Sequence, residues 1–172
     1  HHITKEGYNI PLLEKYINRM QEKYGLKVYL EPGEAVALNA GFLITEVLEL
    51  IDGPEREMPV VILDASAACH MPDVIEMPYR PPLLNSGEEG EKTYSYMLAG
   101  ATCLAGDNIG IYSFDEPLQC GQRLVFGDMA IYTMVKNNTF NGMALPDIYY
   151  VDSQDELKCI KKFAYENFKC RL

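Results

Sequence analysis

The spacing of apolar residues near the start of the chain predicts an amphipathic helix over residues 9–24. Apolar side chains recur there every three or four positions, which places them on one face of a helix. Asn9 is a suitable N-cap residue and Gly25 a suitable C-terminal stop, so both ends of the helix are indicated. The apolar face consists of Leu13, Tyr16, Ile17, Met20 and Tyr24.

A short apolar segment, residues 27–30, follows this helix and has the pattern of a β-strand. It ends at Glu31-Pro32-Gly33, which has the composition of a turn. A helix, a short strand and a charged turn form the kind of unit that repeats in α/β barrels and open parallel sheets. The beginning of the chain therefore indicates α/β structure.

The pattern changes between residues 40 and 151, where short apolar runs alternate with turns rich in Gly, Pro, Asn and Asp. One run, residues 42–51, is compatible with helix or strand. The other strand candidates are residues 58–64, 94–99, 110–114, 123–126, 130–135 and 148–151. This succession predicts an all-β sandwich or barrel, with residues 82–92 as a polar surface loop.

The last segment, residues 153–169, predicts a terminal helix. Ser153 and Glu156 have the spacing of a capping box. Leu157 and Ile160 then fall on one helical face. The complete pattern is thus an α/β segment, an all-β domain and a final helix.

Composition and charge narrow the classes of function. The chain has 172 residues, 48% of them hydrophobic and 23% charged, which is enough for a packed core and argues against disorder. Its 25 acidic and 15 basic residues give a net charge of −10, which disfavours nucleic acid and anionic membranes as partners and suits a cationic ligand. No apolar run reaches the ~20 residues of a membrane span. No signal peptide is visible, so we expect a cytoplasmic protein.

The five cysteines are odd in number and contain no C-x-x-C pair, so we expect reduced thiols rather than a disulfide framework or a zinc ribbon. Cys69-His70 alone is a weak indication of a metal site, because a zinc site needs three or four ligands and the chain has three histidines. The sequence also contains neither a phosphate-binding glycine loop nor the G-x-S-x-G motif of hydrolases.

Three segments carry groups that suit chemistry, and each also has a purely structural interpretation. Glu31 follows directly on a predicted strand, where barrel enzymes place catalytic groups, but the same segment makes a turn. Cys103 and Asp107 lie in one loop, either as a shared site or as a buried thiol beside a surface acid. Tyr132 and the F-N-G turn at 140–142 fit a core strand followed by a hairpin.

Together, E-P-G at 31–33, C-x-x-x-D at 103–107 and D-x-A-x-Y with F-N-G at 128–142 resemble the pyridoxal-phosphate decarboxylases of the alanine-racemase-like fold. That group includes ornithine and diaminopimelate decarboxylases. Three longer segments are similar to carboxynorspermidine or carboxyspermidine decarboxylases: H-H-I-T at 1–4, E-P-G-E-A-V-A-L-N-A-G at 31–41 and M-P-D-V-I-E-M-P-Y-R-P-P at 71–82. The resemblance runs nearly from end to end.

The resemblance implies that the complete enzyme consists of an N-terminal (β/α)8 barrel and a C-terminal β domain. Residues 1–39 then correspond to the last part of the barrel, and residues 40–172 to a β-sandwich or barrel domain with a terminal helix. The lysine that binds pyridoxal 5'-phosphate covalently belongs to the earlier part of the barrel, so this chain alone is expected to be inactive. His1-His2 is then native sequence rather than a tag.

The resemblance also implies roles for site residues. Glu31 pairs with the pyridine nitrogen of the cofactor, with Gly33 beside it, and Tyr132 hydrogen-bonds the cofactor phosphate. Cys103 is delivered across the interface of a homodimer and protonates the carbanion that is left when CO2 departs. The residues implied in binding a polyamine substrate are His1, Glu34, Glu76, Arg80, Asp107 and Phe140.

Departures from the group's pattern bear on the substrate. Glu34 stands where ornithine and diaminopimelate enzymes have arginine, and Leu104 stands where diaminopimelate enzymes have an acid. Both changes count against a diaminopimelate pocket, whereas acids along a channel suit the ammonium groups of a polyamine. Arg80 either binds a carboxylate or forms a salt bridge. The alternatives are a diaminopimelate or ornithine-type decarboxylase and a non-catalytic paralogue that only dimerises with an active enzyme.

Overall fold

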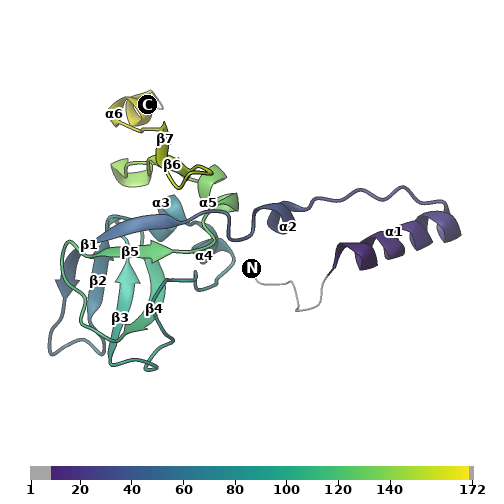
Figure 1. Cartoon of the computed structure of the whole chain (residues 1–172). Coiled ribbons are helices and arrows are strands. Elements are labelled where there is room, and N and C mark those ends of the chain that lie inside the picture. Colours follow the sequence, from purple (N-terminus) through teal and green to yellow (C-terminus); the bar gives the residue numbers. More distant parts are fainter. Residues whose placement is uncertain (1–8, 171–172) are drawn as a thin grey trace. The chain divides into compact units, whose positions relative to one another are not determined.

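The computed structural model describes residues 9–170, without the side chains of residues 34 and 35. The chain divides into two compact units, one that extends to Val36 and one that begins at Ala37 (Figure 1). Each unit is described by itself below. Among the described residues, no helix is both long enough and apolar enough to span a lipid bilayer.

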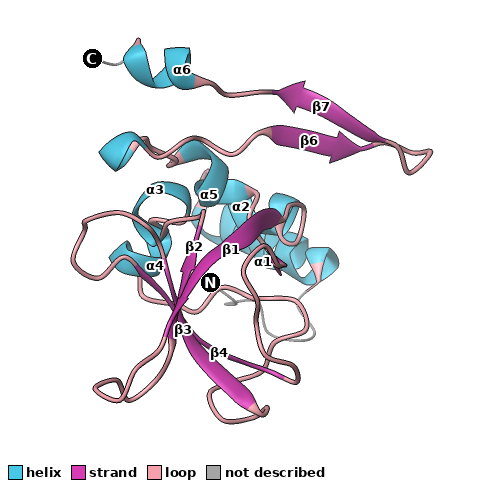
Figure 2. Cartoon of the chain, turned by 90° about the vertical axis from the view of Figure 1, so that its left-hand side faces the viewer, coloured by secondary structure: helices cyan, strands magenta, loops and turns pink. Residues whose placement is uncertain are grey.

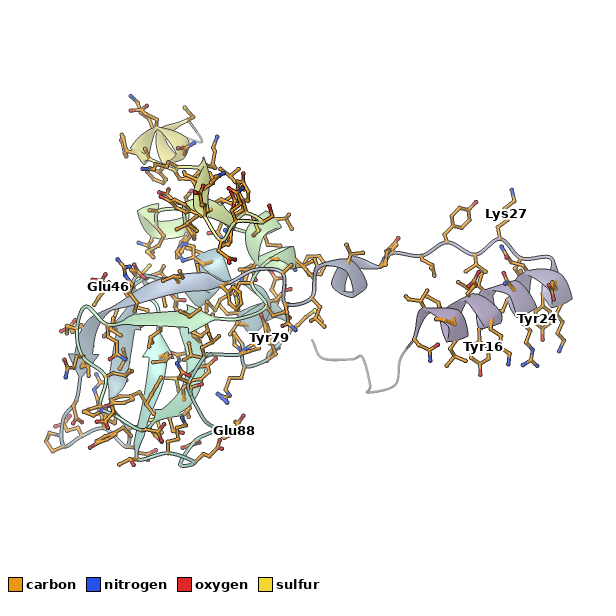
Figure 3. The ribbon with its side chains drawn as sticks, viewed as in Figure 1. Tyr16, Tyr24, Lys27, Glu46, Tyr79 and Glu88 are labelled. Atoms are coloured by element: carbon orange, nitrogen blue, oxygen red, sulfur yellow. The ribbon has the colours of Figure 1, made fainter. Side chains whose placement is uncertain are left out.

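The first unit contains the predicted N-terminal helix, α1 (Ile10–Tyr24). Asn9 caps it by accepting a hydrogen bond from the backbone N–H of Leu12 at 2.7 Å, and Gly25 ends it with a left-handed φ of 64°. Both capping predictions are therefore confirmed. No residue of α1 is buried, so the apolar face that includes Tyr16 and Tyr24 is open to solvent (Figure 3).

The strand predicted at residues 27–30 is wrong, because this segment is extended but forms no strand. A strand needs a neighbour that takes up its N–H and C=O groups, and the described part of the first unit offers none. The segment leads directly into the short helix α2 (Gly33–Ala37), where the second unit begins.

The second unit is built on a five-stranded sheet in the order β4-β3-β2-β1-β5. The strands are β1 (Leu43–Ile51), β2 (Val60–Leu63), β3 (Tyr94–Ala99), β4 (Asn108–Phe114) and β5 (Arg123–Phe126). All neighbours are antiparallel except β2 and β3, which are parallel. Figure 2 shows the strong twist of this sheet.

A parallel pair needs a long crossover connection, and residues 64–93 provide it between β2 and β3. This connection contains α3 (Ala67–His70) and α4 (Asp73–Glu76). Its later part, predicted as a polar surface loop, is partly buried, because Leu83 bridges to Phe126 and Gly87 to Ser113. The crossover thus belongs to the packed domain rather than to its surface alone.

The core lies against one face of this sheet and its crossover. Tyr112 of β4 and Phe126 of β5 are fully buried and meet edge to face, with ring centroids 6.0 Å apart. The Tyr112 hydroxyl donates to the Pro81 carbonyl at 2.7 Å, so its polar atom is satisfied. Burial of each such side chain contributes about 1.5–3 kcal/mol. The ambiguous segment 42–51 becomes the strand β1 because β2 and β5 pair with it on both sides, and Val47 then faces the core.

The strand predicted at residues 130–135 is wrong, because this segment forms the helix α5 (Ile131–Val135). Asp128 turns the chain with a φ of 55° directly after β5. Ala130 then lies against Gly41, at a distance that would leave only 3.0 Å for a Cβ on the glycine. This packing removes the run from the sheet edge, and its backbone bonds are made within a helix instead.

The long C-terminal helix predicted over residues 153–169 is also wrong. β6 (Ile148–Val151) and β7 (Leu157–Lys161) form an antiparallel hairpin, and only α6 (Tyr165–Lys169) is helical. The Asp152 carboxylate accepts hydrogen bonds from the backbone N–H groups of Gln154 and Glu156 at 2.8 and 3.0 Å, which forms a turn in place of the expected capping box. The second unit is consequently a sheet domain with short helices rather than an all-β sandwich.

Candidate functional site

Two of the sequence motifs, although 38 residues apart, meet at Cys103. Cys103 lies in the exposed loop between β3 and β4, and its sulfur is 2.9 Å from the side-chain oxygen of Asn141. The backbone N–H of Cys103 donates to the same oxygen at 3.3 Å. Asn141 is the central residue of the F-N-G turn, the 3-10 helix η1 (Phe140–Gly142). The thiol and this turn therefore form one surface.

Asp107, at the other end of the Cys103 loop, is buried and fully engaged. Its carboxylate accepts hydrogen bonds from the Ser66 hydroxyl at 3.0 and 2.9 Å, from the Ala68 N–H at 3.1 Å, and from the Thr102 hydroxyl at 2.6 Å and N–H at 3.2 Å. The resemblance implied that Asp107 holds the distant amine of the substrate. These hydrogen bonds close the loop, so a substrate amine at Asp107 would have to compete with donors that already face the carboxylate.

Gly100, where the loop leaves β3, permits this closure. A Cβ at this position would lie 2.3 Å from a carboxylate oxygen of Asp107 and 2.7 Å from the Cα of Ser66. Both distances are shorter than side chains tolerate, so only glycine lets the loop and the β2–α3 connection come together. Gly100 was not predicted as a functional position, and the only signal for it in the sequence is a glycine directly after a predicted strand.

A third segment, residues 138–144, contacts α3 and so joins the Cys103 loop and the connection between β2 and α3. The Asn138 side chain donates to the Ala68 carbonyl at 2.8 Å, the Asn138 N–H donates to the Cys69 carbonyl at 3.0 Å, and the Cys69 thiol approaches the Phe140 carbonyl at 3.5 Å. We call residues 64–70, 100–107 and 138–144 the three-loop platform. Cys103 stands exposed on this platform, above a layer of satisfied polar groups.

Cys69 and His70, the pair considered for metal binding, are structural parts of the platform. The Ser66 N–H donates to Nδ1 of His70 at 3.2 Å, so Nε2 carries the proton and lies 2.9 Å from the Ala144 carbonyl oxygen. Burial lowers the pKa of His70 and raises the pKa of the Cys69 thiol, so both side chains are neutral. Within residues 9–170, no three His, Cys, Asp or Glu side chains are grouped to hold a metal.

Tyr132, the expected phosphate partner, is half exposed on α5. The ammonium group of Lys136 lies 5.1 Å from the centre of its ring. That same ammonium is 2.5 Å from a carboxylate oxygen of Asp73 and 3.0 Å from one of Glu76, and these hydrogen bonds raise the pKa of Lys136. Glu76, expected to bind a substrate amine, thus already faces a cation of the same chain.

Arg80 forms a salt bridge, the second of the two alternatives that the sequence left open. Its guanidinium lies 2.6 Å from a carboxylate oxygen of Glu88 and stacks over the Tyr112 ring at 4.4 Å. The guanidinium also approaches the backbone carbonyl oxygens of Gly87 and Ile111 at 3.5 Å. These contacts tie the crossover to β4, which leaves Arg80 little capacity for a substrate carboxylate.

The remaining candidates lie on exposed segments or outside the described residues. Glu31 is exposed, and its carbonyl oxygen accepts a hydrogen bond from the Gly33 N–H at 3.0 Å. A Cβ on Gly33 would meet no atom within 4 Å, so the backbone there is open to approach. Phe140 is exposed next to Asn141 on the platform. His1 and the side chain of Glu34 lie outside the described part.

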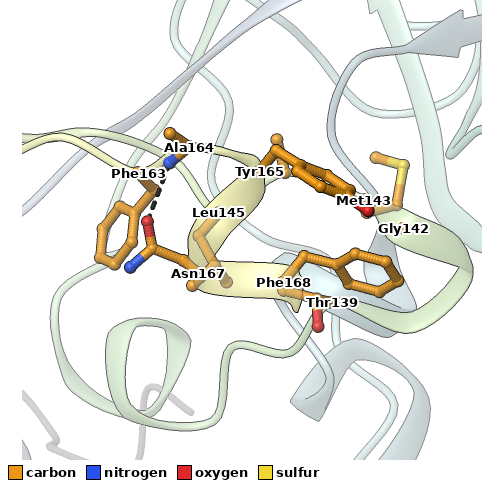
Figure 4. Close-up of a pocket in the computed structure, with 10 residues that line it drawn as sticks. Thr139, Gly142, Met143, Leu145, Phe163, Ala164, Tyr165, Asn167 and Phe168 are labelled. Carbon is orange, nitrogen blue, oxygen red and sulfur yellow. Dashed lines mark hydrogen bonds between the residues drawn. The ribbon is translucent and has the colours of Figure 1, made fainter. Parts of the chain in front are cut away.

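A cavity of about 410 Å³ lies beside the platform, between the segment after η1 and α6 (Figure 4). Its lining is mostly apolar and consists of Thr139, Gly142, Met143, Ala144, Leu145, Phe163, Ala164, Tyr165, Asn167 and Phe168. The sequence carried no signal for it, because it arises only where the two segments pack together. The Ala164 N–H donates to the Asn167 side chain at 2.9 Å and fixes the start of α6 at this cavity.

The chain is similar to known proteins along its whole length. The family model described as "Pyridoxal-dependent decarboxylase, C-terminal sheet domain" matches residues 15–130. A crystal structure of carboxynorspermidine decarboxylase from Campylobacter jejuni, in complex with norspermidine, is 42% identical, with a TM-score of 0.85 over 100% of this chain and 49% of that chain.

Two curated relatives are similar over the full chain. The carboxynorspermidine/carboxyspermidine decarboxylase of Campylobacter jejuni is 43% identical over 99% of the chain and 47% of its own length. The carboxyaminopropylagmatine decarboxylase of Synechocystis is 40% identical over 100% of the chain and 44% of its own length. The chain spans about half the length of the curated relatives it matches.

Proposed function

The chain belongs to the pyridoxal-dependent decarboxylase family, and from this membership we propose that it is part of an enzyme that decarboxylates carboxynorspermidine or carboxyspermidine. The observation that carries the proposal is the 43% identity to an enzyme of this name along nearly the entire chain. The products would be norspermidine or spermidine, so the reaction would belong to polyamine biosynthesis.

Residues 1–39 would form the last part of a (β/α)8 barrel, and residues 40–172 the C-terminal sheet domain. Two features of the first unit support this division. The apolar face of α1 buries no side chain, and residues 27–30 are extended without a partner strand. Both features are expected of elements that pack against the other strands and helices of a barrel.

The exposed side chains of Glu31 and Tyr132 fit pyridoxal 5'-phosphate by their chemistry. The carboxylate would accept a hydrogen bond from the protonated pyridine nitrogen, and the phenol would donate one to the phosphate. The open backbone at Gly33 allows close approach of a ring. When bound, this cofactor supplies an electron sink for the carbanion that remains after CO2 has left.

Cys103 would supply the proton that this carbanion takes up. Its thiol is exposed on the three-loop platform, and the contact with Asn141 holds the sulfur in one orientation. A proton donor acts only within hydrogen-bond reach of the atom it protonates, so a fixed and exposed thiol suits the task. Phe140, exposed on the same turn, would shield the reacting carbon from water.

The platform would complete the site of a second subunit, so the active form would be a homodimer. A mixing experiment tests this. Full-length Cys103→Ala and full-length Glu31→Ala, each strongly impaired alone, should regain part of the activity when mixed, since one mixed site then carries both native residues. If the mixture stays inactive while its subunits exchange, the shared site is refuted.

The substrate would be held by carboxylates that face its ammonium groups. The candidates are Glu34, Glu76 and Asp107, and of these Asp107 is buried and already accepts from the Ser66 hydroxyl. The net charge of −10 would also favour the approach of a polycation. For Glu76 to bind an amine, the substrate would have to replace the ammonium group of Lys136.

The test uses the full-length protein loaded with pyridoxal phosphate. Carboxynorspermidine, carboxyspermidine, carboxyaminopropylagmatine, meso-diaminopimelate and ornithine are offered together, and mass spectrometry identifies the amines formed. We expect norspermidine or spermidine. Lysine or putrescine as the main product would overturn the proposal. Decarboxylation of carboxyaminopropylagmatine alone would favour the second candidate, which the 40% identity to the Synechocystis enzyme supports.

A further inference from the structure

We infer that Asn141 is a positioning residue for Cys103: its side-chain oxygen holds the thiol and the tip of its loop in place. The inference rests on the proposed function in so far as it concerns proton delivery. The observation behind it is that one oxygen contacts Cys103 twice, the sulfur at 2.9 Å and the backbone nitrogen at 3.3 Å.

The double contact fixes which way the amide of Asn141 faces. A backbone N–H can only donate, so the group opposite it must be the amide oxygen and not the NH2 group. The sulfur then meets the same oxygen as an S–H donor. Two contacts to one acceptor restrict rotation about the Cα–Cβ bond of Cys103, which would otherwise have three staggered positions.

Asn141 is itself held firmly by its surroundings. Its backbone is left-handed, with a φ of 59°, a conformation that asparagine tolerates better than most residues. The turn around it is closed by the Gly142 N–H, which donates to the Thr139 carbonyl at 3.0 Å. Through Asn138 and the Phe140 carbonyl, the turn is tied to α3. The oxygen that holds the thiol is thus anchored to the platform.

Because Asn141 has a left-handed backbone, which glycine adopts without strain, its side chain can be removed with little effect on the turn. Asn141→Gly keeps the left-handed backbone conformation available and removes the whole CH2–CONH2 side chain, including the oxygen that contacts Cys103. The variant should therefore fold, and its far-ultraviolet circular dichroism should equal that of the unchanged protein. The test uses the full-length protein. Cys103→Ala is the second variant, and the variant with both changes completes a double-mutant cycle.

The first measurement is the alkylation rate of each cysteine by iodoacetamide at pH 7.5 without cofactor, resolved by peptide mass spectrometry. Cys120, exposed in another loop, is the internal reference. In Asn141→Gly, the rate at Cys103 relative to Cys120 should rise about threefold or more, as expected when one hydrogen bond is lost. An unchanged ratio would overturn the inference.

The second measurement is decarboxylation by the loaded enzyme. Asn141→Gly should lower kcat roughly 10- to 100-fold with KM unchanged, because a misplaced reacting group has an effect of this size. In the Cys103→Ala background the same change should have no further effect, and an additive loss would overturn the inference. If the unchanged protein decarboxylates none of the substrates, the proposed function fails, while the alkylation ratio still decides whether Asn141 holds Cys103.

Discussion

Helix α1 and the three-loop platform are both ordered, but different interactions order them. The helix is defined at both ends by neighbouring residues, Asn9 and Gly25, yet it buries no side chain. The platform contains little regular structure, but hydrogen bonds between residues far apart in sequence satisfy its buried groups. Local signals are therefore enough to shape an element, whereas long-range contacts are needed to place a reactive group.

We expect the stability of the platform to depend on its buried acid, Asp107, and the stability of the first unit not to depend on its exposed acid, Glu31. Asp107→Ala would leave the Ser66 and Thr102 hydroxyls and the Ala68 N–H without their acceptor. We expect the free energy of unfolding to fall by about 3 kcal/mol or more. Chemical denaturation of the full-length protein measures this.

The matched control is Glu31→Ala, which removes an exposed carboxylate of the first unit. Measured without cofactor, its denaturation midpoint should equal that of the unchanged protein, because cofactor binding would itself add stability. If Asp107→Ala and Glu31→Ala lowered the free energy of unfolding equally, burial of the carboxylate would not explain its contribution to stability.

Cys103→Ala should separate activity from stability within the platform itself. The thiol is exposed and contacts only Asn141 among the described hydrogen bonds, so the unfolding midpoint should hardly change. Decarboxylation by the full-length enzyme should fall about 100-fold, in line with the loss of a positioned proton donor. Cofactor absorbance should stay the same. Unchanged turnover would remove Cys103 from the proposed chemistry.

Two glycines, Gly100 in the platform and Gly33 in the first unit, should differ in their tolerance of a side chain. Gly100→Ala would force a Cβ to within 2.3 Å of Asp107, so we expect a loss of about 1–3 kcal/mol in unfolding free energy. Gly33→Ala would place its Cβ in open space and should be harmless to stability. Thermal denaturation of both full-length variants decides this. If only Gly33→Ala lowered the stability, the requirement for glycine would lie at position 33 and not at position 100.

The smallest expected effect is a pH dependence that arises from His70. Burial lowers its pKa from the ordinary value of 6.5, so the unfolded chain takes up a proton more readily than the folded one. The stability contribution of neutral His70 is then complete above pH 6.5 and declines as the pH falls toward the folded pKa. Protonated Nδ1 could no longer accept from the Ser66 N–H.

Denaturation midpoints between pH 8 and 5 would show the decline, and His70→Gln is the control. Glutamine keeps an acceptor and a donor but does not titrate in this range. The difference between the two proteins should therefore change with pH only below about 6.5. A constant difference would exclude His70 as the source.

Several parts of the fold could be predicted because their signals are local. The caps of α1 and the strands β3, β5 and β6 were predicted with the bounds that the structure shows or within one residue of them. In each case a capping residue or a turn lies next to an apolar run in the sequence. Such signals act over a few residues, so no knowledge of the tertiary structure is needed.

The wrong predictions concern segments whose apolar pattern suits two structures. Residues 130–135 have a strand-like composition but form α5, because Asp128 turns the chain away from β5. Residues 157–161 have helical spacing but pair with β6, because Asp152 makes a tight turn between them. Here a partner segment and a turn, rather than the intrinsic preference of the residues, decide the outcome.

At the site, the amino-acid sequence specifies which reactive groups exist: a thiol at Cys103, an amide in the F-N-G turn and acids at Glu31, Glu76 and Asp107. The state of each group follows from the way the chain folds around it. The fold buries Asp107 among donors, places Lys136 against Glu76 and sets Asn141 against the thiol. The physical reason is that burial, hydrogen bonding and charge pairing depend on neighbours in space, and the order of residues along the chain does not specify those neighbours directly.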